Sequence, residues 1–268
     1  MMFNDRKISV WLKTANLFGL VLVIAVNALA NILPLNGITT GEVSDSFPNL
    51  FAPAGFTFSI WGVIYVGLAM FVAYNFDAVA RGRYKESVDK IGWLFFVSCL
   101  LNAAWIVLWH YLQIELTMAV MALLLLVLLR IHGLAREGSN HDIQESIFVK
   151  WPFSIYAGWV TIATVANATA LLVKLRWDGL GLSEEIWTVA MIIVAALVVS
   201  TVTTTRRDVV FGGVFLWTLF GIYSKHQAVF EGAYPKVIIA CFAAGAFTIA
   251  AMAYGFAQKQ KDKRKMFF

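Results

Sequence analysis

The sequence predicts an all-α integral membrane protein with about eight transmembrane helices. Two observations support this fold class. Of the 268 residues, 60% are hydrophobic and only 14% are charged, whereas a soluble domain is about half apolar and a quarter charged. Apolar runs of about 20 residues, each long enough to cross the hydrocarbon core of a bilayer as a helix, recur along the whole chain.

We place eight spans between the more polar segments. The first follows a basic N-terminal stretch, MMFNDRKISVWLK, and lacks a recognisable cleavage site, so we expect it to be retained rather than removed as a signal peptide. The fifth span is the most polar. The expected spans are residues 12–33, 54–76, 90–110, 115–133, 148–173, 185–204, 208–225 and 235–257.

The distribution of Lys and Arg predicts the orientation. If the N-terminus is cytoplasmic, 17 of the 21 Lys and Arg residues fall in cytoplasmic segments and 4 fall on the other side. Positive residues concentrate on the cytoplasmic side of membrane proteins. Because one missed helix would move every later loop to the other side, this imbalance supports eight spans with both termini in the cytoplasm. The net charge of +5 then follows from the topology and does not indicate a nucleic-acid partner. The expected partner is the lipid bilayer.

Aromatic and polar side chains share one face of the fifth span. Because a helix advances about 100° per residue, Tyr156, Trp159 and Asn167 fall in one sector, with small alanines between them. An unpaired side-chain amide is costly in lipid, so Asn167 is expected to face protein or a cavity.

Two earlier spans repeat this pattern. Phe58, Trp61 and Tyr65 share one face of the second span, and one face of the third carries Ser98, Asn102, Trp105 and Trp109. If the three faces converge, they form a pocket with aromatic walls and a few hydrogen-bonding groups, which is the usual composition of a small-molecule site.

Ordinary helix packing is the alternative interpretation of these faces. In the first span, Asn27 and Asn31 lie one helical turn apart, and we expect them to bond to neighbouring helices, with ligand contact as the alternative. Other indoles near span ends are expected in the interfacial aromatic belts of the membrane, namely Trp11, Trp109, Trp151, Trp177 and Trp187.

The same residues resemble a known family. The spacing Tyr156-x-x-Trp159-(x7)-Asn167 resembles the fifth-helix signature of the TspO/MBR family, the tryptophan-rich sensory proteins and translocator proteins. Asn102-x-x-Trp105 in the third span is similar to the NxxW motif of that family.

The second span extends the resemblance, and the chain departs from the family pattern at two places. Pro53, Phe58, Trp61 and Tyr65 resemble the family's second-helix motif, although the entry APAGF has one proline where the family usually has two and an early Trp. In the fifth span, Pro152 lies four residues before the tyrosine instead of directly preceding it. The motifs keep the family's order and helix numbers across residues 1–175.

The resemblance implies a TspO-like five-helix bundle over residues 1–175, followed by a three-helix extension with a basic cytoplasmic tail over 176–268. It also implies a cavity that is lined by the second, third and fifth helices and faces the first loop, residues 33–55. On this basis the expected ligand-binding residues are Phe58, Trp61, Tyr65, Asn102, Trp105, Tyr156, Trp159 and Asn167.

The leading hypothesis is a sensor or carrier that binds a hydrophobic planar small molecule, either a porphyrin or other tetrapyrrole or a sterol-like compound. No cofactor is expected to be required, and no catalytic or metal-binding residue is predicted. Two alternatives stay open. The chain could be an accessory or structural subunit of a larger membrane complex, or a porphyrin-degrading enzyme. The sequence also leaves open a homodimer or a partner within a membrane complex.

Overall fold

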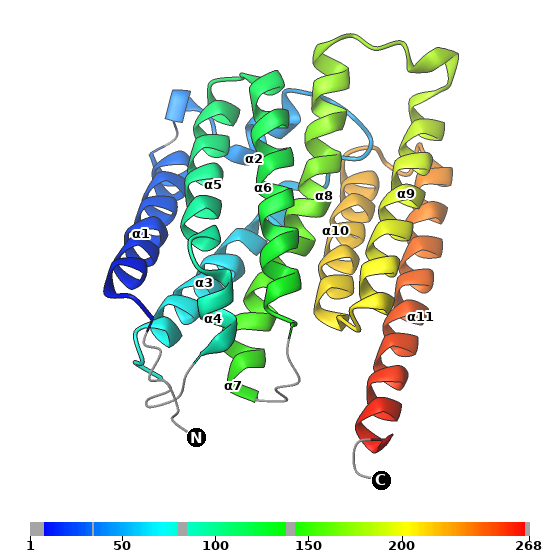
Figure 1. Ribbon diagram of the computed structural model, residues 1–268. Coiled ribbons are helices and arrows are strands. Elements are labelled where there is room, and N and C mark those ends of the chain that lie inside the picture. Colours follow the sequence, from blue (N-terminus) through cyan, green and yellow to red (C-terminus); the bar gives the residue numbers. More distant parts are fainter. Residues whose placement is uncertain (1–7, 34, 80–84, 138–142, 266–268) are drawn as a thin grey trace, which may run out of the picture. The chain divides into compact units, whose positions relative to one another are not determined.

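A computed structural model describes residues 8–33, 35–79, 85–137 and 143–265, and these residues contain helices but no β-strand (Figure 1). All eight predicted spans coincide with helices. These are α1 (Val10–Ile32), α3 (Ile60–Asn75), α5 (Leu94–His110), α6 (Ile114–Leu134), α8 (Trp151–Lys174), α9 (Glu184–Thr205), α10 (Val209–Ala228) and α11 (Pro235–Lys265).

Short helices connect these long ones. A 3₁₀ turn leads directly into α3, and a π-helical turn leads into α8. The short elements are η1 (Leu35–Gly37), α2 (Thr40–Asp45), η2 (Gly55–Ser59), α4 (Glu86–Ile91), α7 (Ile143–Glu145), η3 (Ser146–Lys150) and η4 (Gly179–Gly181).

Length and apolar surface match membrane-spanning helices. Six helical segments in the described part of the chain are long and apolar enough to cross a membrane, and α5 is a shorter apolar helix. Large apolar side chains remain exposed along them, such as Phe18 on α1, Leu126 on α6 and Phe242 on α11. Lipid tails can cover such side chains, whereas water could not do so favourably. The predicted all-α membrane class is confirmed.

Local sequence explains where several helices begin. The Ser183 hydroxyl accepts a hydrogen bond from the Ile186 amide at 3.4 Å and so caps α9. The Asp208 carboxylate accepts from the Val210 amide at 3.2 Å and caps α10. Pro235 occupies the first position of α11, where its missing amide hydrogen costs nothing.

The chain forms two compact units, each of which combines segments that are distant in sequence. Unit 1 comprises residues 1–40 and 60–157, and unit 2 comprises residues 41–59 and 158–268. The boundaries fall at the start of α2, between η2 and α3, and within α8. The predicted boundary near residue 175 separates a family-like part from an extension and is a different division, which stays a prediction.

Unit 1 is built around α5. This helix packs against α1 and α6, and α1 also contacts α3 (Figure 1). The core contains a cluster of three rings, in which the centroid of Phe71 lies 4.9 Å from those of Phe95 and Phe153. Helix α3 approaches the start of α8 closely, because a Cβ atom on Gly67 would lie 3.2 Å from Cβ of Pro152.

Unit 2 contains α9, α10 and α11 side by side (Figure 1). Its other component is residues 41–59, which comprise the later part of the first loop and η2 and form hydrogen bonds with α10. The Ala54 amide donates to the Gly221 carbonyl at 3.1 Å, and Trp217 Nε1 donates to the Thr57 carbonyl at 3.0 Å. The segment before α3 is therefore held by a helix about 160 residues further along the chain.

We expect Gly221→Ala to lower the stability of unit 2 by about 1–3 kcal/mol, because an added methyl group overpacks this contact. A Cβ atom at Gly221 would lie 2.1 Å from Thr57 Oγ1 and 3.0 Å from Pro53 Cβ. Gly213→Ala on the same helix is the matched control, since its added Cβ would have no described neighbour within 4 Å apart from its chain neighbours and the nearby backbone of α10 itself. Thermal unfolding in detergent measures both variants, and equal stability of the two would contradict the close contact.

Candidate ligand-binding site

Unit 1 brings together five of the eight predicted ligand-binding residues. Trp61 and Tyr65 come from α3, Asn102 and Trp105 from α5, and Tyr156 from the start of α8. The Trp61 ring stacks on Tyr65 at 5.8 Å between centroids, with an interplanar angle of 18°. It also lies 5.9 Å from Trp105 and meets Tyr156 edge-on at 6.1 Å. We call these four rings the aromatic cluster.

A chain of hydrogen bonds runs beside the aromatic cluster. Asn27 Nδ2 donates to Asn102 Oδ1 at 3.0 Å, and Asn102 Nδ2 donates to the Tyr156 hydroxyl at 2.8 Å. These bonds connect α1, α5 and α8. The prediction that Asn27 bonds to a neighbouring helix is confirmed. The same prediction is confirmed for Asn31, since Oδ1 accepts from the amide of Thr40, the first residue of α2, at 3.4 Å, while Nδ2 donates to the Asn27 carbonyl within α1.

The Tyr65 hydroxyl is a polar group of the cluster that could form a hydrogen bond to a ligand. It is buried and has no hydrogen-bond partner among the described residues. A buried polar group without a partner is costly, and such groups are few in folded proteins. No three His, Cys, Asp or Glu side chains gather to hold a metal ion in the described part of the chain. The groups that the cluster offers to a ligand are therefore ring faces and phenol hydroxyls.

Trp109 extends the cluster along α5, although sequence analysis assigned it to an interfacial belt. Its ring stacks on Trp105 at 5.8 Å, and its Nε1 donates to the Thr40 carbonyl at 3.2 Å. Only 4% of Trp109 is exposed, so protein rather than lipid surrounds the indole. The helical face that Trp109 shares with Asn102 and Trp105 in the sequence was the signal for this position.

The other three predicted residues belong to unit 2. Phe58 in η2 meets Trp159 of α8 edge-on, with 5.9 Å between the ring centroids. Asn167, two turns further along α8, is buried. That all eight residues line a single cavity stays a prediction.

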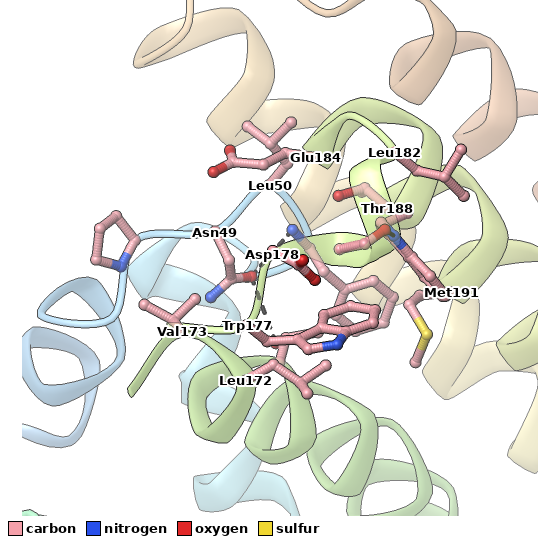
Figure 2. A pocket seen from close by; sticks show the side chains of 15 residues that line it. Asn49, Leu50, Leu172, Val173, Trp177, Asp178, Leu182, Glu184, Thr188 and Met191 are labelled. Carbon is pink, nitrogen blue, oxygen red and sulfur yellow. Dashed lines mark hydrogen bonds between the residues drawn. The ribbon is translucent and has the colours of Figure 1, made fainter. Parts of the chain in front are cut away.

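Unit 2 also contains a pocket that sequence analysis did not predict (Figure 2). Its volume is about 260 Å³. Residues 48–51 of the first loop form one wall, and the end of α8, the α8–α9 linker and the start of α9 form the others. Trp177 and Trp187, which were expected in a membrane belt, both line it. We call this the linker pocket.

Comparison with known proteins identifies the family. The family model described as TSPO-like protein matches residues 13–254. The chain belongs to the TSPO-like family. In this TSPO-like protein, the match runs through α9 and α10 into α11, so the additional helices are part of the family's own sequence pattern. The resemblance inferred from the Trp, Tyr and Asn motifs is confirmed. No curated protein and no solved structure matches the chain significantly.

We expect Asn102→Ala and Tyr156→Phe to be energetically coupled by about 1 kcal/mol, because each removes the same interhelical hydrogen bond. The double variant should therefore lose less stability than the sum of the single variants. Equilibrium unfolding of the four proteins in detergent measures this coupling. The control is Asn102→Ala combined with Ser224→Ala, a substitution in unit 2 that does not touch this bond. The stability losses of these two variants should be additive. Additivity in the first cycle as well would contradict the bond.

Proposed function

We propose that this TSPO-like protein binds a hydrophobic planar molecule at the aromatic cluster of unit 1 and acts as a sensor or carrier for it. The observation that carries the proposal is the buried, unpartnered hydroxyl of Tyr65, whose ring stacks on Trp61, with the Trp105 ring 5.9 Å from Trp61. A ligand that stacks on these rings and accepts a hydrogen bond would satisfy that hydroxyl.

The chemistry of the cluster favours a tetrapyrrole over a sterol. Aromatic faces stack favourably on other planar π-systems, and a porphyrin supplies both a planar body and several acceptor atoms. The Tyr156 hydroxyl accepts from Asn102 and keeps its own hydrogen as a donor. Tyr65 and Tyr156 together therefore offer two donors, whereas a sterol has a puckered ring system and a single hydroxyl.

The individual residues have different expected roles. Tyr65 is half-buried, whereas Trp61, Trp105 and Tyr156 are buried, so an entering ligand meets Tyr65 first. Trp61 is within about 6 Å of three other rings, so a ligand that stacks on both Trp61 and Tyr65 must separate them. The Asn102 amide is used by Asn27 and Tyr156, and it positions the Tyr156 phenol rather than contacting the ligand.

We expect protoporphyrin IX to bind the purified protein saturably, and Tyr65→Phe to weaken binding about fivefold or more, because the variant lacks only the donor hydroxyl. An absorbance-shift titration measures binding without depending on the protein's own fluorescence, and cholesterol serves as the comparison ligand. Tyr111→Phe, at an exposed position after α5, is the matched control and should bind like the wild type.

Two results would contradict the proposal. Equal affinity in wild type and Tyr65→Phe would mean that the hydroxyl does not contact the ligand. No saturable binding of either ligand would favour the accessory-subunit alternative. Loss of the bound porphyrin only under light and oxygen would instead indicate the porphyrin-degrading alternative, which requires the same site.

We also infer that both termini lie in the cytoplasm, because 17 of the 21 Lys and Arg residues then lie on the cytoplasmic side. Four of these residues, Arg6, Lys7, Arg81 and Arg83, lie outside the described residues, and so do the side chains of the C-terminal basic cluster. The eight helices between the charged segments support the assignment of the remaining Lys and Arg residues to alternate sides of the membrane.

Cysteine labelling tests the orientation. We expect Gln227→Cys, at the exposed end of α10, to react with a membrane-impermeant maleimide in intact cells. Arg206→Cys, in the exposed α9–α10 turn, should react only after the membrane is opened. The native Cys99 and Cys241 are buried, which limits background labelling. The reverse pattern would place both termini outside.

A further inference from the structure

The linker pocket of unit 2 has an acidic character. Two carboxylates, Asp178 and Glu184, line it, and no Lys, Arg or His occurs among its lining residues. Lys174 and Arg176 precede the linker in sequence but do not line the pocket. Both carboxylates belong to exposed residues, so a ligand can reach them.

Indole rings form the apolar side of the same pocket. Trp177 and Trp187 meet edge to face with 4.7 Å between ring centroids, and Leu172 and Met191 complete this side. Figure 2 shows the Trp177 ring lying in the pocket beside Asp178. Indole faces attract organic cations through their quadrupole, and a carboxylate next to an indole adds charge attraction. This combination does not suit an anion.

Internal hydrogen bonds hold the first-loop wall of the pocket in place. Asn49 Oδ1 accepts from the amides of Phe51 at 3.1 Å and Ala52 at 2.8 Å, and its Nδ2 donates to the Phe47 carbonyl. Thr169 of α8 also donates to Asn49 Oδ1, at 3.5 Å. The Asn49 side chain therefore holds residues 47–52 of the loop together and connects them to α8 before any ligand binds (Figure 2).

The opposite wall, the α8–α9 linker, is equally constrained. Asp178 Oδ1 accepts from the Leu180 amide at 3.0 Å, and Trp187 Nε1 donates to the Gly179 carbonyl. Gly179 has φ +68°, and a Cβ atom there would lie 3.1 Å from the Trp187 ring, so the position requires glycine. A pocket with walls fixed in this way loses little conformational entropy on binding.

We propose that the linker pocket is a second binding site, which takes an organic ammonium ion attached to a small apolar group. Its volume of about 260 Å³ lies just below the usual range for drug-sized ligands, which fits a head group with one ring or a short chain. The ammonium lies against Trp177 between Asp178 and Glu184, and the apolar group lies toward Leu172 and Met191. The site uses residues of unit 2 alone and is independent of the porphyrin proposal.

Titration with benzyltrimethylammonium in a neutral maltoside detergent tests this site. We expect saturable one-to-one binding by calorimetry, and about a fivefold or greater loss of affinity in Glu184→Gln and in Trp177→Leu. Asp178→Asn keeps the acceptor for the Leu180 amide and should also weaken binding. Glu231→Gln, an exposed acidic position of unit 2 away from the pocket, should bind like the wild type.

An anionic analogue and a competitor complete the experiment. Benzylsulfonate has a similar size and opposite charge and should not bind. Binding of both probes alike, no saturable binding of the cation, or wild-type affinity in both Glu184→Gln and Trp177→Leu would overturn the proposal. Competition by short-chain phosphatidylcholine, but not by its phosphatidylglycerol counterpart, would identify a lipid head group as the source of the ammonium, and no competition would identify a soluble cation.

One experiment distinguishes a wrong proposal for the linker pocket from a wrong proposal for the porphyrin site. Excess benzyltrimethylammonium should leave the protoporphyrin IX titration unchanged, because the two ligands use different units. Displacement of porphyrin by the cation would contradict a separate site.

Discussion

Lipid tails offer no hydrogen-bond partner to a buried amide or hydroxyl of a helix bundle, so the partner must come from the protein or from a bound ligand. In unit 1 this constraint is met at Asn102, which accepts from Asn27 and donates to Tyr156. One side chain thus ties three helices together. It also fixes the Tyr156 ring, against which Trp61 packs. The Asn102 hydrogen bonds therefore fix the Tyr156 side of the aromatic cluster.

In unit 2 the corresponding constraint is close backbone approach. Gly221 lets residues 54–57 lie directly against α10, where the Ala54 amide and the Trp217 indole complete the hydrogen bonds of the loop. His226 adds a further bond to the Leu50 carbonyl at 2.9 Å. The helices that follow residue 176 therefore provide partners for the first loop, which a five-helix bundle would lack. They also provide the α9 wall of the linker pocket.

The two proposed sites differ in chemistry for physical reasons that are visible in their residues. The aromatic cluster contains uncharged donors among stacked rings, which suits a large planar molecule with acceptor atoms. The linker pocket pairs indoles with carboxylates near helix ends, where a charged ligand remains accessible to water. The four rings of the cluster include no carboxylate, whereas Asp178 and Glu184 can balance a cation in the pocket.

The sequence by itself determined the helices and the family. Apolar runs located all eight helices because hydropathy is a local property of the chain, and the spacing of Tyr156, Trp159 and Asn167 indicated the TSPO-like family. Helical periodicity likewise placed Trp61 beside Tyr65. Tertiary structure alone decided that Asn102 bonds to Asn27, that Trp109 lies inside protein rather than in a membrane belt, and that Trp177 and Trp187 line a pocket. These outcomes depend on which distant segments pack together, as with Thr57 and Trp217, and local periodicity carries no information about such partners.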